Sequence, residues 1–463
     1  MTDSALPALE SHAIAPSRAL PFPGLVGIFL GASLCLHLAG AVYFAFGDSL
    51  QAAVSVLFGQ FLLGLSILRL VDGAFVFQDI RLFFLIFFFF YGATLPMVVA
   101  FGLQGGTAGL AGAAFMYATG MFAFNFVQWW YRQPWHDVPP ESFARYRPSF
   151  ANAVLVFLGF VWIISYIKSR SIPLSGGIDR DRANWVATQV WVVSMFAMNG
   201  LVMYGFIGWN QLTRKAKVVL VLTVISFVLL QISFGNRRDF LPMLIFLAGV
   251  TAARRHSVIR FWTVLLGILA FAGLTILGIL RQVIAAPVLL ASDPVTILVT
   301  QSEFVSPIQT LIYYVAKPHA LRFGWTYLTA PLLLIPRAFW PGKPESLSLQ
   351  FMRDAFGTTE IMGYAYTPVT EAVLNFGLVG PAIFFAILSI LMVKLVKNAD
   401  LRPGLYFICF SVVVDFNRGD VPGTFYQVVC IGAAFWFMHF LSRVRWAPRI
   451  LRATFPEAPP VND

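Results

Sequence analysis

Residues 82–102 read LFFLIFFFFYGATLPMVVAFG, an apolar stretch of 21 residues without a charged side chain. At 1.5 Å per residue, a helix of this length covers about 30 Å, the thickness of a bilayer's hydrocarbon core. Lipid offers no hydrogen-bond partner to backbone amides, so a spanning segment must bond its own backbone, as an α-helix does. The stretch therefore predicts a transmembrane helix, and the alternating pattern of an outer-membrane barrel is absent.

Similar apolar stretches recur along the chain and predict about twelve transmembrane helices. The first is too long for the apolar region of a cleaved signal peptide and lacks a small-residue cleavage site, so we expect a retained anchor. Two of the predicted spans, near 240–253 and 403–416, are short for a crossing. The spans are predicted near residues 22–47, 51–69, 82–102, 107–131, 151–167, 186–210, 218–234, 240–253, 261–280, 370–393, 403–416 and 424–441.

The composition also indicates a polytopic membrane protein. Of the 463 residues, 59% are hydrophobic and 11% are charged, whereas a soluble domain carries about 25% charged residues. So little charge cannot cover a water-facing surface of this size, which excludes a cytosolic enzyme, a secreted disulfide scaffold and a disordered chain. Cys35, Cys409 and Cys430 lie in apolar stretches. They fit neither metal-ligand spacing nor a disulfide framework, and we expect inert thiols.

The basic residues predict the orientation of the chain. They lie in short clusters between apolar runs, so no nucleic-acid partner is expected. If the N-terminus is cytoplasmic, inner segments hold 19 of the 32 Lys and Arg residues, Arg81 among them, and the outer segments hold 13. This bias follows the positive-inside rule and places both termini in the cytoplasm. The predicted division is a tail (1–21), membrane helices one to nine (22–281), an outer loop (282–368), membrane helices ten to twelve (369–441) and a second tail (442–463).

Residues 282–368 are too polar to cross a bilayer. Apolar runs such as Trp325–Ile335 are too brief, and dipeptides such as Lys317-Pro318 interrupt helices. A loop of this length is usually functional or disordered, and its aromatic content argues against disorder. We predict short helices that lie in the membrane interface and form a lid or substrate platform; a plain structural cap is the alternative.

Histidines and aromatic runs within the spans have structural interpretations. His37 and His439 are predicted to form hydrogen bonds between packed helices. The run Phe87–Tyr91 is expected to face lipid, and Trp129–Tyr131 is expected to lie in the interfacial belt.

Ionisable residues are almost absent from the central turns of the spans and gather at the outer ends, which argues against a proton relay or voltage sensor. Guanidinium groups match the oxygens of phosphate and diphosphate through bidentate hydrogen bonds. A partly desolvated carboxylate accepts a proton from an incoming hydroxyl. This pattern is typical of chemistry on a polyprenyl-diphosphate sugar, whose leaving group cations stabilise without a nucleotide. The candidate residues are Arg237, Arg238, Arg281, Arg337, Lys343, Glu371 and Arg418.

Structural alternatives remain open for these candidates. A single Arg at a helix end can mark topology or extend its charge out of the membrane. Glu371 can favour the N-terminus of its own helix through the dipole. The segment Arg418–Asp420 can form a tight turn with a local ion pair. No Asp, Glu and His cluster has the spacing of metal ligands, so neither a metal nor a cofactor is expected.

Two stretches resemble the Wzy-type O-antigen polymerases, the oligosaccharide repeat-unit polymerases of bacterial envelopes. Residues 334–344 (LIPRAFWPGKP) and 370–380 (TEAVLNFGLVG) are similar to the family pattern IPR-x-x-W-P-x-KP followed by E-x-x-x-NFG-x-x-G. Residues 235–239 and 417–420 are similar to the basic positions before and after that core. The likeness covers the second half of the chain, and the first half only by topology.

The resemblance implies a glycosyltransferase of GT-C-like fold in the bacterial inner membrane, with its active site facing the periplasm. It would pass a glycan from undecaprenyl diphosphate to the non-reducing end of a new lipid-linked repeat unit, and a chain-length regulator protein is a possible partner. Alternatives are an O-antigen ligase and a polysaccharide or lipid transporter. By the same resemblance, Glu371 (base or orienting group) and Arg281 are the catalytic pair, and the substrate-binding residues are Arg237, Arg238, Arg337, Lys343 and Arg418.

Overall fold

The structure, a computed structural model, describes residues 23–102, 105–106, 108–169, 189–233, 239–255, 304–335, 340, 344–358 and 365–443. These residues form helices joined by turns, and no β-strand occurs among them. Nine helical segments of this described part are long and apolar enough to cross a membrane. The protein is therefore an all-α polytopic membrane protein, as the hydropathy of the sequence predicts.

Eight of the nine segments are single helices that coincide with predicted spans. Another predicted span, near 240–253, is present as the shorter apolar helix α10 (Leu241–Arg254). The predicted span near 261–280 lies outside the described residues. The eight single helices are α1 (Pro23–Ala45), α2 (Ser49–Asp72), α3 (Ile80–Ala100), α4 (Leu110–Tyr131), α6 (Phe150–Ser169), α8 (Gln189–Ile207), α9 (Arg214–Ser233) and α20 (Val421–Arg443).

The ninth segment, predicted as one span near 370–393, is broken into two helices. Helix α16 (Pro368–Phe376) ends at a 3-10 turn, η5 (Gly377–Val379), and α17 (Gly380–Lys397) follows it. At the break Gly377 has φ +65° and ψ −148°, a backbone conformation that is essentially restricted to glycine. A hydropathy profile cannot detect this break because the residues on both sides of it are apolar.

The predicted span near 403–416 is also divided. Helix α18 (Pro403–Ser411) and helix α19 (Val413–Asn417) meet at Val412, which belongs to neither. Each is much shorter than the roughly 20 residues that a crossing requires. The segment is therefore two short helices that lead into α20, rather than the one continuous helix predicted near 403–416.

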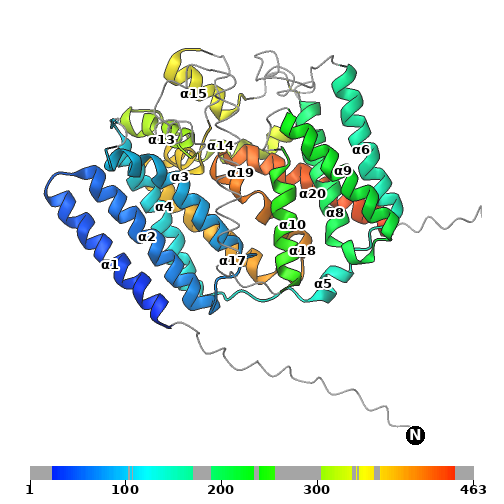
Figure 1. Cartoon of the computed structure of the whole chain (residues 1–463). Helices are drawn as coiled ribbons and strands as arrows, with labels where there is room; N and C mark the ends of the chain where they lie inside the picture. The colour runs from blue at the N-terminus through cyan, green and yellow to red at the C-terminus, as the bar shows by residue number, and fades with distance from the viewer. Residues whose placement is uncertain are drawn as a thin grey trace, which may run out of the picture.

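Short helices from the predicted outer loop gather at one end of the bundle, at the top of Figure 1. They are α13 (Ser306–Ala316), α14 (Trp325–Thr329), η4 (Ala330–Leu334) and α15 (Leu347–Phe356). This is the end at which α3 finishes and α4 begins, because a Cβ on Gly109 would lie 2.9 Å from the Ile312 carbonyl oxygen of α13. We call it the loop end. Below it, α17 packs on α4, and α20 packs on α8.

The aromatic run in α3 belongs mostly to the protein interior, so the prediction that it faces lipid was wrong. Phe88, Phe89 and Tyr91 are buried, and Phe90 is exposed. Helix α3 contacts α2, α4, α13, α17, α18 and α19, so most of its circumference faces protein. Hydropathy alone does not separate a lipid-facing side chain from one that faces another apolar helix.

Polar side chains join α1, α2 and α4 within the bundle. The Gln60 amide donates to Nε2 of His37 (2.9 Å), whose Nδ1 lies 2.7 Å from the Ser33 carbonyl oxygen. Asn125 of α4 donates to the Gln60 carbonyl at 2.8 Å. These contacts confirm the helix-packing role predicted for His37. His439 likewise packs its ring against Tyr204.

Arg81 is a buried ion-pair partner rather than an exposed marker of topology. Its side chain is 1% exposed, and its Nη2 lies 2.9 Å from Asp72 Oδ1 and 2.8 Å from Asp79 Oδ2. Its Nη1 donates to the Gln133 carbonyl at 2.5 Å. The guanidinium therefore ties the end of α2, the start of α3 and the segment after α4 together. Removing the guanidinium from water costs free energy, and attraction to its two carboxylate partners offsets that cost. A buried charge without a partner would have no such compensation.

The contact between α8 and α20 depends on Gly200. A Cβ at this position would lie 2.2 Å from the Ile431 carbonyl oxygen and 2.9 Å from the Ala434 Cβ. We expect Gly200→Ala to force these helices apart and to lower the free energy of unfolding by about 1–3 kcal/mol, the usual cost of overpacking. Thermal unfolding of the purified protein in detergent measures the effect. The matched control is Gly432→Ala on α20, where a Cβ meets nothing within 4 Å; equal melting temperatures for the two variants would contradict the prediction.

Candidate functional site

Two of the seven predicted site residues, Glu371 and Arg418, lie within the described residues. Glu371 is in the first turn of α16. Arg418 follows the last residue of α19 and precedes Val421, the first residue of α20, by three positions. The other five predicted site residues lie outside the described part of the chain. They are Arg237, Arg238, Arg281, Arg337 and Lys343.

The N-terminus of helix α16 is capped by the residue that precedes it. The Thr367 side chain accepts a hydrogen bond from the Thr370 amide (3.0 Å) and caps the helix. Pro368 follows at the first helical position, where its missing N–H costs no hydrogen bond. The next turn places Glu371 on the side of α16 that faces α14 and α20.

The Glu371 carboxylate is fully buried, and each of its oxygens accepts a hydrogen bond. The Thr326 hydroxyl of α14 donates to Oε1 at 2.5 Å, and the Val421 amide of α20 donates to Oε2 at 2.7 Å. A carboxylate at the N-terminus of a helix interacts favourably with the helix dipole. Glu371 occupies this position for its own helix and for α20 as well. It is not the partly exposed carboxylate that we expected to meet an incoming hydroxyl.

Asn375, one turn after Glu371, connects the same elements through its side chain. Its Nδ2 donates to the Thr326 hydroxyl oxygen (2.6 Å) and to the Glu371 carbonyl (2.9 Å). Its Oδ1 accepts from the Gly324 amide at 3.0 Å. Asn375 is fully buried, so these bonds are made away from solvent, where an unmade bond costs most.

The turn that Asn375 holds has an unusual backbone. Phe323 has φ +48° and Gly324 has φ +83°, and a bulky side chain seldom adopts a positive φ. The Phe323 amide donates to the Asn375 carbonyl at 2.9 Å, and the Arg322 amide donates to the Leu374 carbonyl at 3.2 Å. These bonds to the end of α16 hold the strained turn. We call residues 322–325 the presenting turn, because it places Arg322 and Trp325 at the edge of one hollow.

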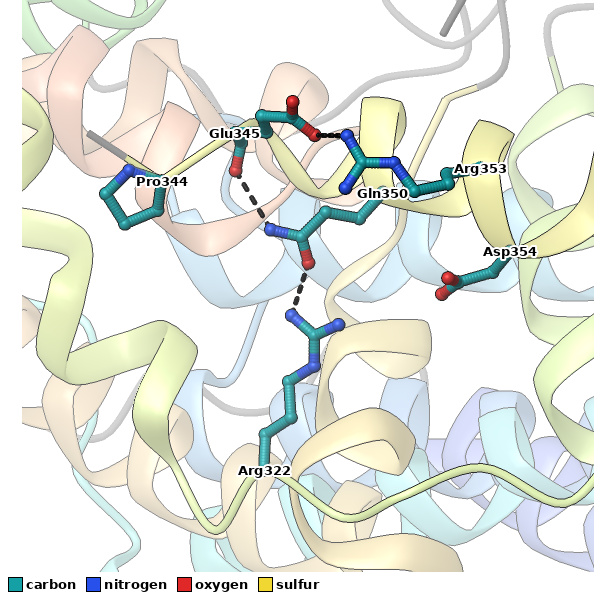
Figure 2. Close-up of a pocket in the computed structure, with 6 residues that line it drawn as sticks. All are labelled: Arg322, Pro344, Glu345, Gln350, Arg353 and Asp354. Atoms are coloured by element: carbon teal, nitrogen blue, oxygen red, sulfur yellow. Dashed lines mark hydrogen bonds and ion pairs between the residues drawn. The ribbon is translucent and has the colours of Figure 1, made fainter. Parts of the chain in front are cut away.

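Two adjoining hollows lie beside the presenting turn. The smaller, the α20 hollow, has a volume of about 170 Å³ and reaches the start of α20. The larger, the α15 hollow, has a volume of about 470 Å³ and extends along α15 (Figure 2). Arg322, Pro344, Glu345 and Gln350 line both, so we treat the two as one groove. The α20 hollow is further lined by Trp325, Thr326, Thr329, Leu333, Ser346, Leu347, Asp420, Pro422 and Gly423, and the α15 hollow by Arg353 and Asp354.

Polar contacts across the groove hold α15 over the presenting turn. The Arg322 guanidinium donates to the Gln350 side-chain carbonyl, and the Gln350 amide donates to the Glu345 backbone carbonyl at 3.1 Å (Figure 2). Arg353 pairs with the Glu345 carboxylate at 2.5 Å. The Asp354 carboxylate accepts a hydrogen bond from the Tyr314 hydroxyl at 2.9 Å. The groove wall therefore presents charges of both signs.

The tyrosines packed beneath the groove are hydrogen-bond donors at neutral pH. Burial, and then the neighbouring Glu371 carboxylate, raises the pKa of the Tyr327 phenol above its ordinary value. Burial is also the main cause that raises the pKa of the Tyr314 phenol and of the Tyr366 phenol. A phenol whose pKa is raised keeps its proton and cannot serve as a base. Carboxylates are therefore the stronger candidates for proton acceptance at this site.

Sequence reasoning found Glu371 but missed the residues that line the groove. Arg322 and Trp325 belong to the predicted outer loop, in which the sequence singled out Arg337 and Lys343 instead. Trp325 is 60% exposed and lines the α20 hollow. The local sequence feature next to Arg322 and Trp325 is the Phe323-Gly324 pair. A single sequence, however, does not show that this turn has a positive φ. Among the described residues, no group of three or more His, Cys, Asp and Glu side chains is placed to hold a metal ion.

Comparison of the chain with models of protein families, with curated proteins and with solved structures finds no match.

Asn375→Ala tests whether the side chain of Asn375 holds the presenting turn in place. The variant leaves the buried Gly324 amide without its acceptor, and we expect a loss of about 1–3 kcal/mol of stability. A lower melting temperature and faster proteolytic cleavage near residues 322–325 measure it. The control is Asn398→Ala, because Asn398 is exposed and its amide donates to the Lys394 carbonyl one turn away. If the turn in Asn375→Ala is cleaved no faster than in the control, Asn375 does not hold it.

Proposed function

We propose that this protein is a membrane glycosyltransferase that polymerises undecaprenyl-diphosphate-linked repeat units at the outer leaflet of the bacterial inner membrane. The observation that carries the proposal is the position of Glu371, Asn375 and Gly377, the residues of the E-x-x-x-NFG pattern. Glu371 bonds to the start of α20, Asn375 bonds to the presenting turn, and Gly377 allows α16 to end there. All three support one groove at the loop end of the helix bundle.

The groove has groups suited to glycosyl transfer. The acceptor hydroxyl attacks the anomeric carbon of the donor, the bond from that carbon to the phosphate oxygen breaks, and undecaprenyl diphosphate leaves with the electron pair. A carboxylate at the reacting end accepts the hydroxyl proton, and Asp420 lines the α20 hollow there. Guanidinium groups stabilise the charge that develops on the leaving diphosphate. Arg418, two residues from Asp420, is the candidate for that role within the described residues.

Glu371 acts in this scheme as a positioning residue. It does not line the groove, but it bonds to Thr326, which does, and to Val421 at the start of α20. A shift of either partner moves the groove wall next to Asp420. Misplacement by about 1 Å is enough to lower a rate a hundredfold when reacting groups must be aligned.

Reconstitution of the purified protein in lipid vesicles with a defined undecaprenyl-diphosphate-linked repeat unit tests the proposal. We expect products of two or more repeat units, resolved as a ladder on a gel and identified by mass. The alternatives give different results. Transfer of glycan to lipid A-core, without longer lipid-linked glycan, would indicate a ligase. Movement of the lipid-linked unit across the membrane without elongation would indicate a transporter.

Glu371→Gln is predicted to remove most of the polymer. Glutamine offers one acceptor oxygen and one donor NH₂, so it cannot accept from Thr326 and Val421 at once. Leaving a buried donor without its acceptor costs about 1–3 kcal/mol, and we expect a tenfold or greater loss of long product together with a lower melting temperature. Glu141→Gln is the control, because Glu141 is exposed in the short helix α5 (Pro140–Ala144). Ladders of normal length from Glu371→Gln would remove this residue from the scheme.

Arg418→Lys is predicted to slow transfer while the protein stays folded. Lysine keeps the charge but loses the planar fork that binds two phosphate oxygens together. We expect a loss of about tenfold in the rate of elongation, the size of one 1.4 kcal/mol contribution. Initial rates in vesicles measure it, and Arg402→Lys, at an exposed position before α18, is the control. An unchanged rate would exclude a bidentate role for Arg418.

A further inference from the structure

Among the described residues, the groove as a whole is lined by one more acidic than basic side chain, and Trp325 lies at its edge in the α20 hollow. Three carboxylates line the groove, those of Glu345, Asp354 and Asp420, against the two guanidinium groups of Arg322 and Arg353. Both guanidinium groups already have partners within the groove, Gln350 and Glu345 (Figure 2). The carboxylates have partners too: Glu345 pairs with Arg353, the Tyr314 hydroxyl donates to Asp354, and the Gly423 amide donates to Asp420 at 2.7 Å. A carboxylate has about four lone-pair sites, so each of them can also accept a hydrogen bond from a sugar hydroxyl.

We propose that this groove binds the sugars of the acceptor glycan, that Trp325 is the platform for a sugar ring, and that the carboxylates select neutral or amino sugars over acidic ones. The inference rests on the proposed function, because it assigns the acceptor half of that reaction to a place in the fold. The reacting end lies at Asp420 in the α20 hollow. The rest of the acceptor extends past Arg322 and Gln350 into the α15 hollow.

The size of the groove suits such a ligand. Pockets for small ligands have volumes of about 300–1,000 Å³, and the α15 hollow alone has about 470 Å³. The α20 hollow is smaller, at about 170 Å³, as expected of a part that admits the reacting sugar only. The two hollows share four lining residues, so a chain of sugars can pass from one to the other.

The residue types match the chemistry of a glycan. A sugar has an apolar face of C–H bonds, which packs on a flat aromatic ring, and an edge of hydroxyl groups. Trp325 is 60% exposed at the mouth of the α20 hollow, although an indole ring gains free energy when it is covered. Carboxylates accept hydrogen bonds from hydroxyl groups, and Gln350 both donates and accepts. The strain in the presenting turn is also typical of backbone that positions a ligand.

The sign of the charge decides which glycans fit. A uronate sugar in the α15 hollow would bring its carboxylate close to Asp354, and like charges in contact disfavour the wrong ligand. In this scheme the lipid-linked diphosphate of the donor is bound on the side of Arg418, and the acceptor glycan approaches from the side of α15.

A glycan array of lipid-free repeat-unit oligosaccharides, sorted into neutral and uronate-containing sets, tests the inference with the purified full-length protein in detergent. We expect the neutral set to bind about tenfold more tightly than acidic glycans of the same length. No bound glycan, or tighter binding of the acidic set, would overturn the inference. Failure of the preference to change with salt would also count against it, because repulsion between exposed charges is screened.

Two variants connect the array result to the groove. Trp325→Ala should weaken binding of neutral glycans about tenfold, as loss of an aromatic anchor does, and Trp325→Phe should restore most of it. Asp354→Asn keeps an acceptor for the Tyr314 hydroxyl but removes the charge. It should tighten the binding of uronate glycans several-fold relative to neutral glycans, a change of preference that a purely structural role would not cause. The control is Trp130→Ala, at an exposed position of α4; equal effects of Trp325→Ala and this control would place the sugars elsewhere.

Elongation assays separate this inference from the proposed function. If the protein binds neutral glycans through Trp325 but elongates no lipid-linked repeat unit, the groove assignment stands and the polymerase proposal fails. If it elongates repeat units, and Trp325→Ala and Asp354→Asn leave the KM for the acceptor unchanged, the polymerase proposal stands and the groove assignment fails.

Discussion

The constraint on which this structure depends is that a buried backbone group must find a hydrogen-bond partner inside the protein. Long helices meet it along their length, and each place where a helix stops needs another solution. At the end of α16, the carbonyls of Leu374 and Asn375 accept from the amides of Arg322 and Phe323. At the start of α20, the Val421 amide donates to Glu371. One short helix, α16, thus supplies partners for two other segments, from its first turn and from its last.

This exchange of partners explains how a groove forms at the loop end of the bundle. The presenting turn leads into the first residue of α14, and its conformation includes a positive φ at Phe323. It is held because α16 offers it two carbonyls and the side chain of Asn375. Arg322 and Trp325 thereby face α15 on one side and the start of α20 on the other. The same short helix therefore determines the position of the cation, the aromatic ring and the Asp420 carboxylate.

Most long helices could be predicted from the sequence because hydropathy is a local property. A run such as 82–102 is apolar whatever surrounds it, and its length alone requires a helix in lipid. The break at Gly377 could not be predicted, because it depends on a φ and ψ pair that one sequence does not display. The burial of Phe88 and Arg81 could not be predicted either, since both depend on which helices become neighbours. Apolar runs show which segments form membrane helices. They do not show which side chains contact each other in the folded protein.

The sequence by itself determined that this is an all-helical membrane protein with its charged residues concentrated at helix ends and in one long loop. It also singled out Glu371 and Asn375 as parts of one short pattern. Only the tertiary structure decided that Glu371 lies behind the groove wall and that Arg322, Trp325 and Asp420 line the wall itself. The reason is that these side chains come from the loop and from the turn before α20, about a hundred residues apart. Their proximity results from hydrogen bonds between distant segments, which no local pattern of residues encodes.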